Sequence, residues 1–235
     1  VFYNSYLPDI AHKEQQDKIS AKGFSLGYVG SVILLLICLA MVMMVEETQA
    51  IQMMKYSFLL VGIWWIGFSQ YTYYYLPDNK NSNKMHKNLI FNGFRELLKV
   101  WHQIKNILPL KRYLAAFFVY SMAVQTIMII AAYFGEKEVQ WGSDSKRTTG
   151  LIISILVIQL VAVFGAWITS KLVEKFGNIK VLMLLNFLWI LICTYAYFVV
   201  TPNDFYMAAF FVGLVMGGIQ SLSRSTYSKL IPSDT

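Results

Sequence analysis

The chain has 235 residues, of which 57% are hydrophobic and only 14% are charged, and its mean hydropathy is +0.50. Soluble domains usually carry about 25% charged residues, so this composition excludes an ordinary soluble protein. The formal net charge is +7. Because the positive residues are spread over segments between apolar runs, we predict no nucleic-acid partner and interpret the charge as a sign of membrane topology.

Six apolar segments are long enough to cross a lipid bilayer, which takes about 20 residues of helix. They contain none of the 20 Lys and Arg or the 13 Asp and Glu residues. An ionised side chain at the centre of a spanning helix costs about 2.5–3.5 kcal/mol, which explains this exclusion. The sequence therefore predicts an all-α polytopic membrane protein. Its predicted spans are 26–45, 57–76, 113–134, 150–170, 181–200 and 205–223.

A basic connector divides the predicted spans into two groups. Residues 1–76 are predicted to hold the end of a first six-helix half, with the tip of a span, a short polar loop at 11–22 and two complete spans. The connector, 77–112, carries eight of the 20 Lys and Arg residues, and its apolar residues recur at three- and four-residue steps from 90 to 108. This pattern predicts an amphipathic helix that tethers the halves at the membrane surface, with docking of a partner as the alternative. Residues 113–235 hold the other four spans, which begin a second half.

The positive residues also predict the orientation in the membrane. Loops on the connector's side carry 16 of the Lys and Arg residues, whereas loops on the other side carry four. By the positive-inside rule, the connector is cytoplasmic. This orientation places Asn81 in the cytoplasm and Ser143 outside. We expect a bacterial cytoplasmic membrane, with a vacuolar membrane as the alternative.

The segment between the fourth and fifth spans carries a motif. Residues 171–180 read KLVEKFGNIK and resemble the cytoplasmic loop signature of the major facilitator superfamily, Gly-x-Leu-Ala-Asp-Arg-x-Gly followed by basic residues. Ser170 stands where glycine is usual, and Glu174 and Lys175 stand where the superfamily has Asp-Arg.

Three further stretches resemble one family of that superfamily, the vacuole-effluxer-like (autophagy-related) family with its bacterial relatives. They are 20–28 (SAKGFSLGY), 124–126 (VQT) and 217–225 (GGIQSLSRS). The resemblance runs along the whole chain and implies a twelve-helix bundle of the major facilitator type, of which this fragment holds six complete spans and lacks both ends. It also implies amino-acid efflux. Many relatives carry Tyr-Asn-Asp-Gly where this chain has Tyr-Ser-Met-Ala at 120–123, so coupling to protons or to sodium is left open.

Candidate site residues are the polar side chains within the spans. An unpartnered polar group in lipid is costly, so such residues face a bundle interior or a watery cavity. Hydrogen bonding between helices, worth about 0.6 kcal/mol on average, is the alternative for each of them. The predicted substrate-path residues are Tyr120, Ser121, Gln125, Thr126, Gln159, Asn186 and Gln220.

Two other sets of residues have predicted roles. The resemblance implies a cytoplasmic gate in which an acidic loop residue, Glu174, pairs with a basic residue, Arg224, at a neighbouring helix end. The predicted gate residues are Glu174, Lys175, Gly177 and Arg224. Glycines at helical spacing allow helix backbones to approach closely. The predicted helix-packing residues are Gly23, Gly27, Gly30, Gly213, Gly217 and Gly218.

The sequence shows no pattern for catalysis. His12, His86 and His102 have no second ligand at metal-binding spacing, and no phosphate-binding glycine loop is present. Cys38 and Cys193 lie in predicted spans and are interpreted as apolar side chains. We therefore predict no enzyme activity, no metal and no cofactor.

The favoured function is transport of small polar solutes. We expect a monomeric secondary active or facilitated transporter, surrounded by lipid, that works by alternating access. The alternative is a multi-pass membrane receptor that does not transport, or a membrane-embedded enzyme.

Overall fold

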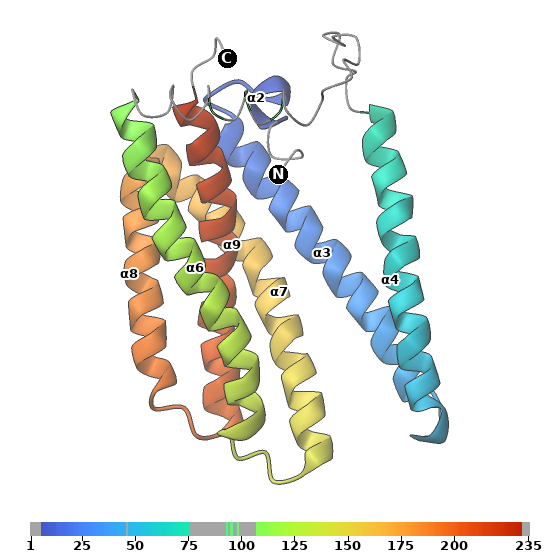
Figure 1. The fold of residues 1–235 in the computed structure, drawn as a ribbon. Helices are drawn as coiled ribbons and strands as arrows, with labels where there is room; N and C mark the ends of the chain where they lie inside the picture. The colour runs from blue at the N-terminus through green and yellow to red at the C-terminus, as the bar shows by residue number, and fades with distance from the viewer. Residues whose placement is uncertain are drawn as a thin grey trace. The chain divides into compact units, whose positions relative to one another are not determined.

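The structure, a computed structural model, describes residues 6–45, 47–75, 93, 95, 98 and 107–231. It divides into two compact units, Val1–Val32 with Ile107–Thr235, and Ile33–Asn106. Every regular element of the described residues is an α-helix (Figure 1). The helices are α2 (Leu7–Ile10), α3 (Gln16–Met43), α4 (Glu47–Tyr75), α6 (Leu108–Lys137), α7 (Asp144–Phe176), α8 (Asn178–Ala196) and α9 (Pro202–Leu230).

The prediction of six spanning helices is confirmed. Among the described residues, α3, most of α4, and α6 to α9 are long and apolar enough to cross a membrane. The helices extend beyond the predicted spans: α3 begins at Gln16 and α9 continues to Leu230. The second part of the predicted loop 11–22 is therefore helical, and that prediction is wrong. Charged residues can continue a helix outside the hydrocarbon layer, so an apolar window underestimates the length of the helix.

The first compact unit joins segments that lie far apart in the sequence. It contains the start of α3, from the predicted first half, together with α6 to α9 of the predicted second half. The division into two six-helix halves stays a prediction. Most of the predicted connector 77–112 lies outside the described residues, and the described Gly93, Arg95 and Leu98 are helical.

The core of the first unit is the contact between α7 and α9. The glycines of these helices let the two backbones touch, because a Cβ added at Gly217 would meet the carbonyl oxygen of Ala162 at 2.0 Å. Added Cβ atoms at Gly213 and Gly165 would meet backbone carbonyl oxygens of the facing helix at 2.6 and 2.1 Å. Gly218 instead lies against the side chain of Thr169 on α7.

The predicted packing glycines of α3 behave differently. A Cβ added at Gly27 or Gly30 would meet no atom within 4 Å. The structure therefore gives no helix contact that depends on either glycine. Spacing of small residues permits a close approach of helices but does not require one. The sequence analysis missed Gly165 of α7. The spacing of Gly213 and Gly217 indicates that α9 can approach another helix closely, but it does not identify the residues of that helix.

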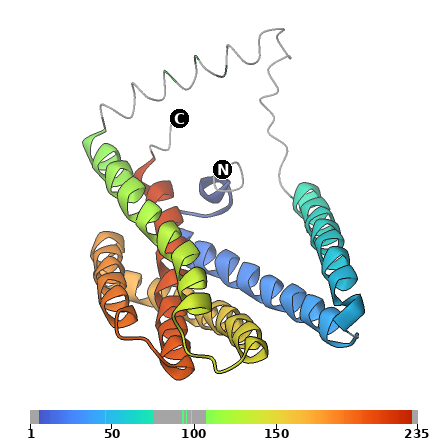
Figure 2. The same ribbon diagram turned by 60° about the horizontal axis from the view of Figure 1, so that its bottom comes forward.

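The loops from α6 to α7 and from α8 to α9 lie at the same end of the first unit (Figure 2). Trp141 packs there against Phe205 and Tyr206, and its indole N–H donates to the carbonyl of Gly135 at 2.6 Å. The backbone N–H of Gln140 donates to Val200 of the other loop at 3.1 Å. These contacts fix the helix ends opposite to the polar cavity described below.

Candidate functional site

A polar cavity of about 560 Å³ lies between the start of α3, the first half of α6 and the second half of α9. Phe24 contributes from α3, and the remaining lining residues belong to α6 and α9. Cavities of this size accommodate small molecules. The lining includes five residues that the sequence analysis singled out: Tyr120, Ser121, Gln125, Gln220 and Arg224.

Two tyrosines of α6 direct their hydroxyl protons towards α9. Tyr113 donates to the carbonyl oxygen of Ser223 at 2.7 Å, and the Tyr120 hydroxyl lies 2.7 Å from Ser223 Oγ. Ser223 Oγ itself donates to the carbonyl of Ile219 at 2.5 Å. Because a serine hydroxyl has one proton, Tyr120 must be the donor in its bond with Ser223. Both tyrosine oxygens therefore keep only acceptor capacity for other groups.

The start of α3 is attached to α9 beside this cavity. The Tyr28 hydroxyl donates to Gln220 Oε1 at 2.8 Å, and Ser20 Oγ donates to the carbonyl oxygen of Ser221 at 2.7 Å. Ser20 is fully buried. Since Gln220 uses its amide oxygen for Tyr28, its amide nitrogen is available to the cavity that Gln220 lines.

Arg224 is the charged residue among the described residues that line the cavity, and only 9% of its surface is exposed. Its predicted partner Glu174 is exposed, and the ion pairs between described residues do not include one between Glu174 and Arg224. Lys175 lies over the ring of Phe176, with its Nζ 5.4 Å from the ring centroid. The structure thus does not bring the predicted gate pair together, and its gating role stays a prediction.

Gly177, also a predicted gate residue, has a structural role that its conformation explains. It separates α7 from α8 with φ of 83°, a backbone conformation that favours glycine. This turn places the start of α8 beside the end of α9, where Asn178 reaches Thr226 at 3.3 Å.

Three predicted substrate-path residues lie outside the lining of the polar cavity. Asn186 donates to the carbonyl oxygen of Leu182 on its own helix at 2.9 Å. Thr126 is exposed and Gln159 is half-buried. The sequence pattern could not show that these three residues lie away from the cavity. A polar residue in a span need not face a cavity, because it can satisfy its hydrogen bonds within its own helix.

A charged network near the cavity was missed by the sequence analysis. The Asp17 carboxylate of α3 forms an ion pair with Lys229 of α9, and Asn178 of α8 donates to the same carboxylate at 2.7 Å. Lys229 also donates to Asn178 Oδ1 at 3.2 Å. The Asp17 and Lys229 side chains are only 11% and 24% exposed. In the sequence these charges are indistinguishable from other charges at helix ends.

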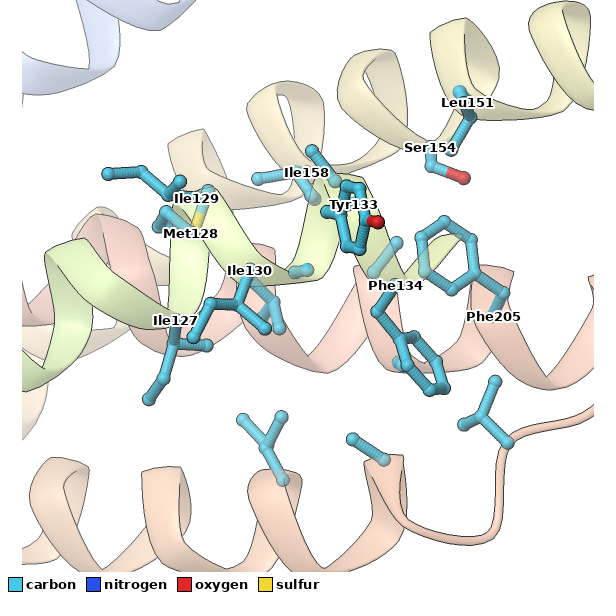
Figure 3. Close-up of a pocket in the computed structure, with 18 of the residues that line it drawn as sticks. Ile127, Met128, Ile129, Ile130, Tyr133, Phe134, Leu151, Ser154, Ile158 and Phe205 are labelled. Atoms are coloured by element: carbon cyan, nitrogen blue, oxygen red, sulfur yellow. The ribbon is translucent and has the colours of Figure 1, made fainter. Parts of the chain in front are cut away.

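A second cavity, of about 790 Å³, lies between the other ends of α6, α7, α8 and α9. Figure 3 shows its mainly apolar side chains, with Tyr133 and Ser154 as the labelled residues that carry hydroxyls. Ser154 donates its proton to the carbonyl of Gly150 at 2.8 Å. This cavity offers a polar solute few partners, so the polar cavity is the better candidate site. Among the described residues, no cluster of three His, Cys, Asp or Glu side chains is arranged to hold a metal ion.

Comparison with known proteins gives a consistent family assignment. Residues 1–235 match the family described as "Vacuole effluxer Atg22 like". The chain is 32% identical over 241 residues to "Uncharacterized MFS-type transporter YxiO" of Bacillus subtilis (strain 168), covering 99% of this chain and 54% of that protein. It is 26% identical over 238 residues to "Autophagy-related protein 22-1" of Aspergillus niger, covering 92% of this chain and 38% of that protein. The chain thus spans about half, or less, of the length of these relatives. No solved structure matches it.

Proposed function

Because the chain belongs to the vacuole effluxer Atg22-like family, we propose that its full-length protein is a transporter that exports small polar solutes by alternating access. Amino acids are the proposed solute class. The matched family and the bacterial relative are described as an effluxer and as a transporter, not as enzymes. The protein is a multi-pass membrane protein, and we place it in a bacterial cytoplasmic membrane, as a monomer, with the connector 77–112 in the cytoplasm.

The observation that carries this proposal is the position of the polar cavity. Its walls come from α3 of the predicted first half and from α6 and α9 of the predicted second half. Transporters of this type bind solutes between two halves, which then move against each other. A cavity enclosed within one half would not be exposed alternately to the two faces.

The polar contacts beside the cavity also support the proposal, because they would allow α3 to move relative to α9. The start of α3 is joined to α9 through a few polar contacts, namely those of Ser20, Tyr28 and Asp17. Such contacts can break without exposing a large apolar core, unlike the glycine-lined contact of α7 with α9. In the proposed orientation, they close the cytoplasmic end.

Flux measured in proteoliposomes tests the proposal. The full-length protein should transport at least one of the twenty labelled L-amino acids under an imposed proton or sodium gradient, while empty liposomes should not. Ser121→Trp would fill the polar cavity and should reduce the flux about tenfold or more. Thr126→Trp, on an exposed face of the same helix, is the matched control and should retain it.

Two results would refute the proposal. One is the absence of flux for all twenty amino acids from correctly folded protein in either gradient. The other is binding of an amino acid without flux, which would favour the receptor alternative.

A further inference from the structure

The three stretches that carry the family resemblance meet at the polar cavity. They are 20–28, 124–126 and 217–225, and they belong to α3, α6 and α9. Each stretch contributes to the lining of the cavity, with Phe24, Gln125 and Gln220 among the contributed residues. Stretches that lie far apart in the sequence are therefore brought to one place in the fold.

Within the described residues, two hydrogen bonds join the first stretch to the third. Ser20 Oγ donates to the backbone carbonyl oxygen of Ser221 at 2.7 Å, and the Tyr28 hydroxyl donates to the side-chain oxygen of Gln220 at 2.8 Å. Both bonds attach α3 to α9, but only the bond from Tyr28 ends on a side chain that lines the cavity. Tyr28 does not belong to the lining, so it holds a residue of the cavity wall from outside.

The bond from Tyr28 determines which end of the Gln220 amide faces the cavity. The amide oxygen accepts the hydroxyl proton, and this leaves the NH2 group for the cavity that Gln220 lines. Among the described residues, this nitrogen has no hydrogen-bond partner. An amide that rotates freely can present either its oxygen or its nitrogen, whereas an amide held by its oxygen presents a donor. Tyr28 therefore makes Gln220 a positioned donor.

The wall formed by α6 presents acceptors instead. Tyr120 donates its hydroxyl proton to Ser223, and Ser121 donates its proton to the carbonyl of Phe118 at 3.3 Å. Tyr120 and Ser121 both line the cavity, and their oxygens can only accept hydrogen bonds from a ligand. A solute that satisfies both walls carries an acceptor oxygen for α9 and a donor for α6. Amino acids carry both groups.

We propose that Gln220 donates its amide N–H to an acceptor oxygen of the transported solute, and that Tyr28 is the positioning residue that orients this donor. The inference rests on the proposed transport function and adds two residues that determine specificity. A neutral amide can donate to any acceptor oxygen, so the interaction does not depend on a charged partner. One such hydrogen bond changes the affinity about 2- to 10-fold.

Binding of the twenty L-amino acids to the purified full-length protein tests both roles, with the shift of the thermal unfolding midpoint as the measurement. For the amino acid that stabilises the wild type most, a titration of this shift gives the affinity. Gln220→Leu removes the donor and should weaken binding about 2- to 10-fold. Tyr28→Phe keeps the donor but removes the group that orients it, so it should weaken binding by the same factor or less.

Two comparisons separate positioning from a purely structural role. Ser20→Ala also removes one hydrogen bond between α3 and α9, but it does not touch the Gln220 amide, so it should leave the affinity nearly unchanged. In the Gln220→Leu background, Tyr28→Phe should cause no further loss of affinity, because its effect requires this amide. The midpoint without ligand shows whether each variant is folded, and Gln220→Met replaces Gln220→Leu where the latter does not fold.

The inference is overturned if Tyr28→Phe or Gln220→Leu binds like the wild type, or if Ser20→Ala weakens binding as much as Tyr28→Phe. It is also overturned if Tyr28→Phe causes the same loss with and without Gln220, or if no amino acid stabilises the wild type. Amino-acid flux with an unchanged KM in both variants would sink this inference and leave the transport function standing. Absence of all flux from the folded wild type would instead count against the transport function itself.

Discussion

Breaking the ion pair between Asp17 and Lys229 should open the end of the first unit that carries the polar cavity. The Asp17 carboxylate accepts hydrogen bonds from Lys229 and from Asn178, so one side chain connects α3 with both α8 and α9. The pair is mostly buried, with 11% and 24% of the two side chains exposed. Exposed pairs contribute about 0.2–1 kcal/mol, whereas loss of one partner of a buried pair costs about 3–5 kcal/mol.

An intermediate value of about 2 kcal/mol suits this degree of burial. If the network forms only when α3 lies against α9, Asp17→Asn or Lys229→Gln should shift the equilibrium towards the open state about 30-fold. The double reversal, Asp17→Lys with Lys229→Asp, should recover part of the loss. Asp144→Asn is the matched control, because it removes an exposed ion pair with Arg147 at the other end of the unit.

The rate of thiol labelling measures this opening. Tyr227 lines the polar cavity and is 39% exposed, so Tyr227→Cys in a cysteine-free full-length protein provides the reporter. Maleimide added from the cytoplasmic face should label it faster in either single variant than in the parent or in Asp144→Asn. Unchanged labelling in both single variants would refute the reasoning, because the network would then contribute nothing to closure.

Three other predictions concern orientation, packing and the cavity wall. Asn81→Cys should be protected from an impermeant thiol reagent added to intact cells and Ser143→Cys should be labelled, and the reverse pattern would overturn the orientation. Gly217→Val should destabilise the protein by about 3 kcal/mol or more, because its Cβ would meet a backbone oxygen at 2.0 Å. The control Gly27→Ala should leave the thermal unfolding midpoint nearly unchanged. Equal effects of the two substitutions would contradict the contact assigned to Gly217. Tyr120→Phe removes one hydrogen bond and one acceptor, and it should weaken amino-acid binding several-fold with little change in folding, as a titration of the midpoint shift would show.

The existence of the helices was predictable, but their ends were not. Apolar segments without charge indicate spans because ionised groups are costly in lipid. The same criterion placed the start of α3 too late in the sequence. The helix already includes Asp17, whose charge is paired with that of Lys229. A charged residue at a helix end looks the same in the sequence whether it faces water or a partner.

The candidate site was predictable in part for a similar reason. Ser121 and Gln125 are four residues apart and share one face of α6, which the helical period shows without a structure. The family resemblance implied a gate role for Arg224 at the end of the last apolar segment, and in the structure Arg224 lines the cavity because α9 continues to Leu230. The sequence could not show whether the polar residues of α7 and α8 line the cavity, because this depends on the contacts between helices.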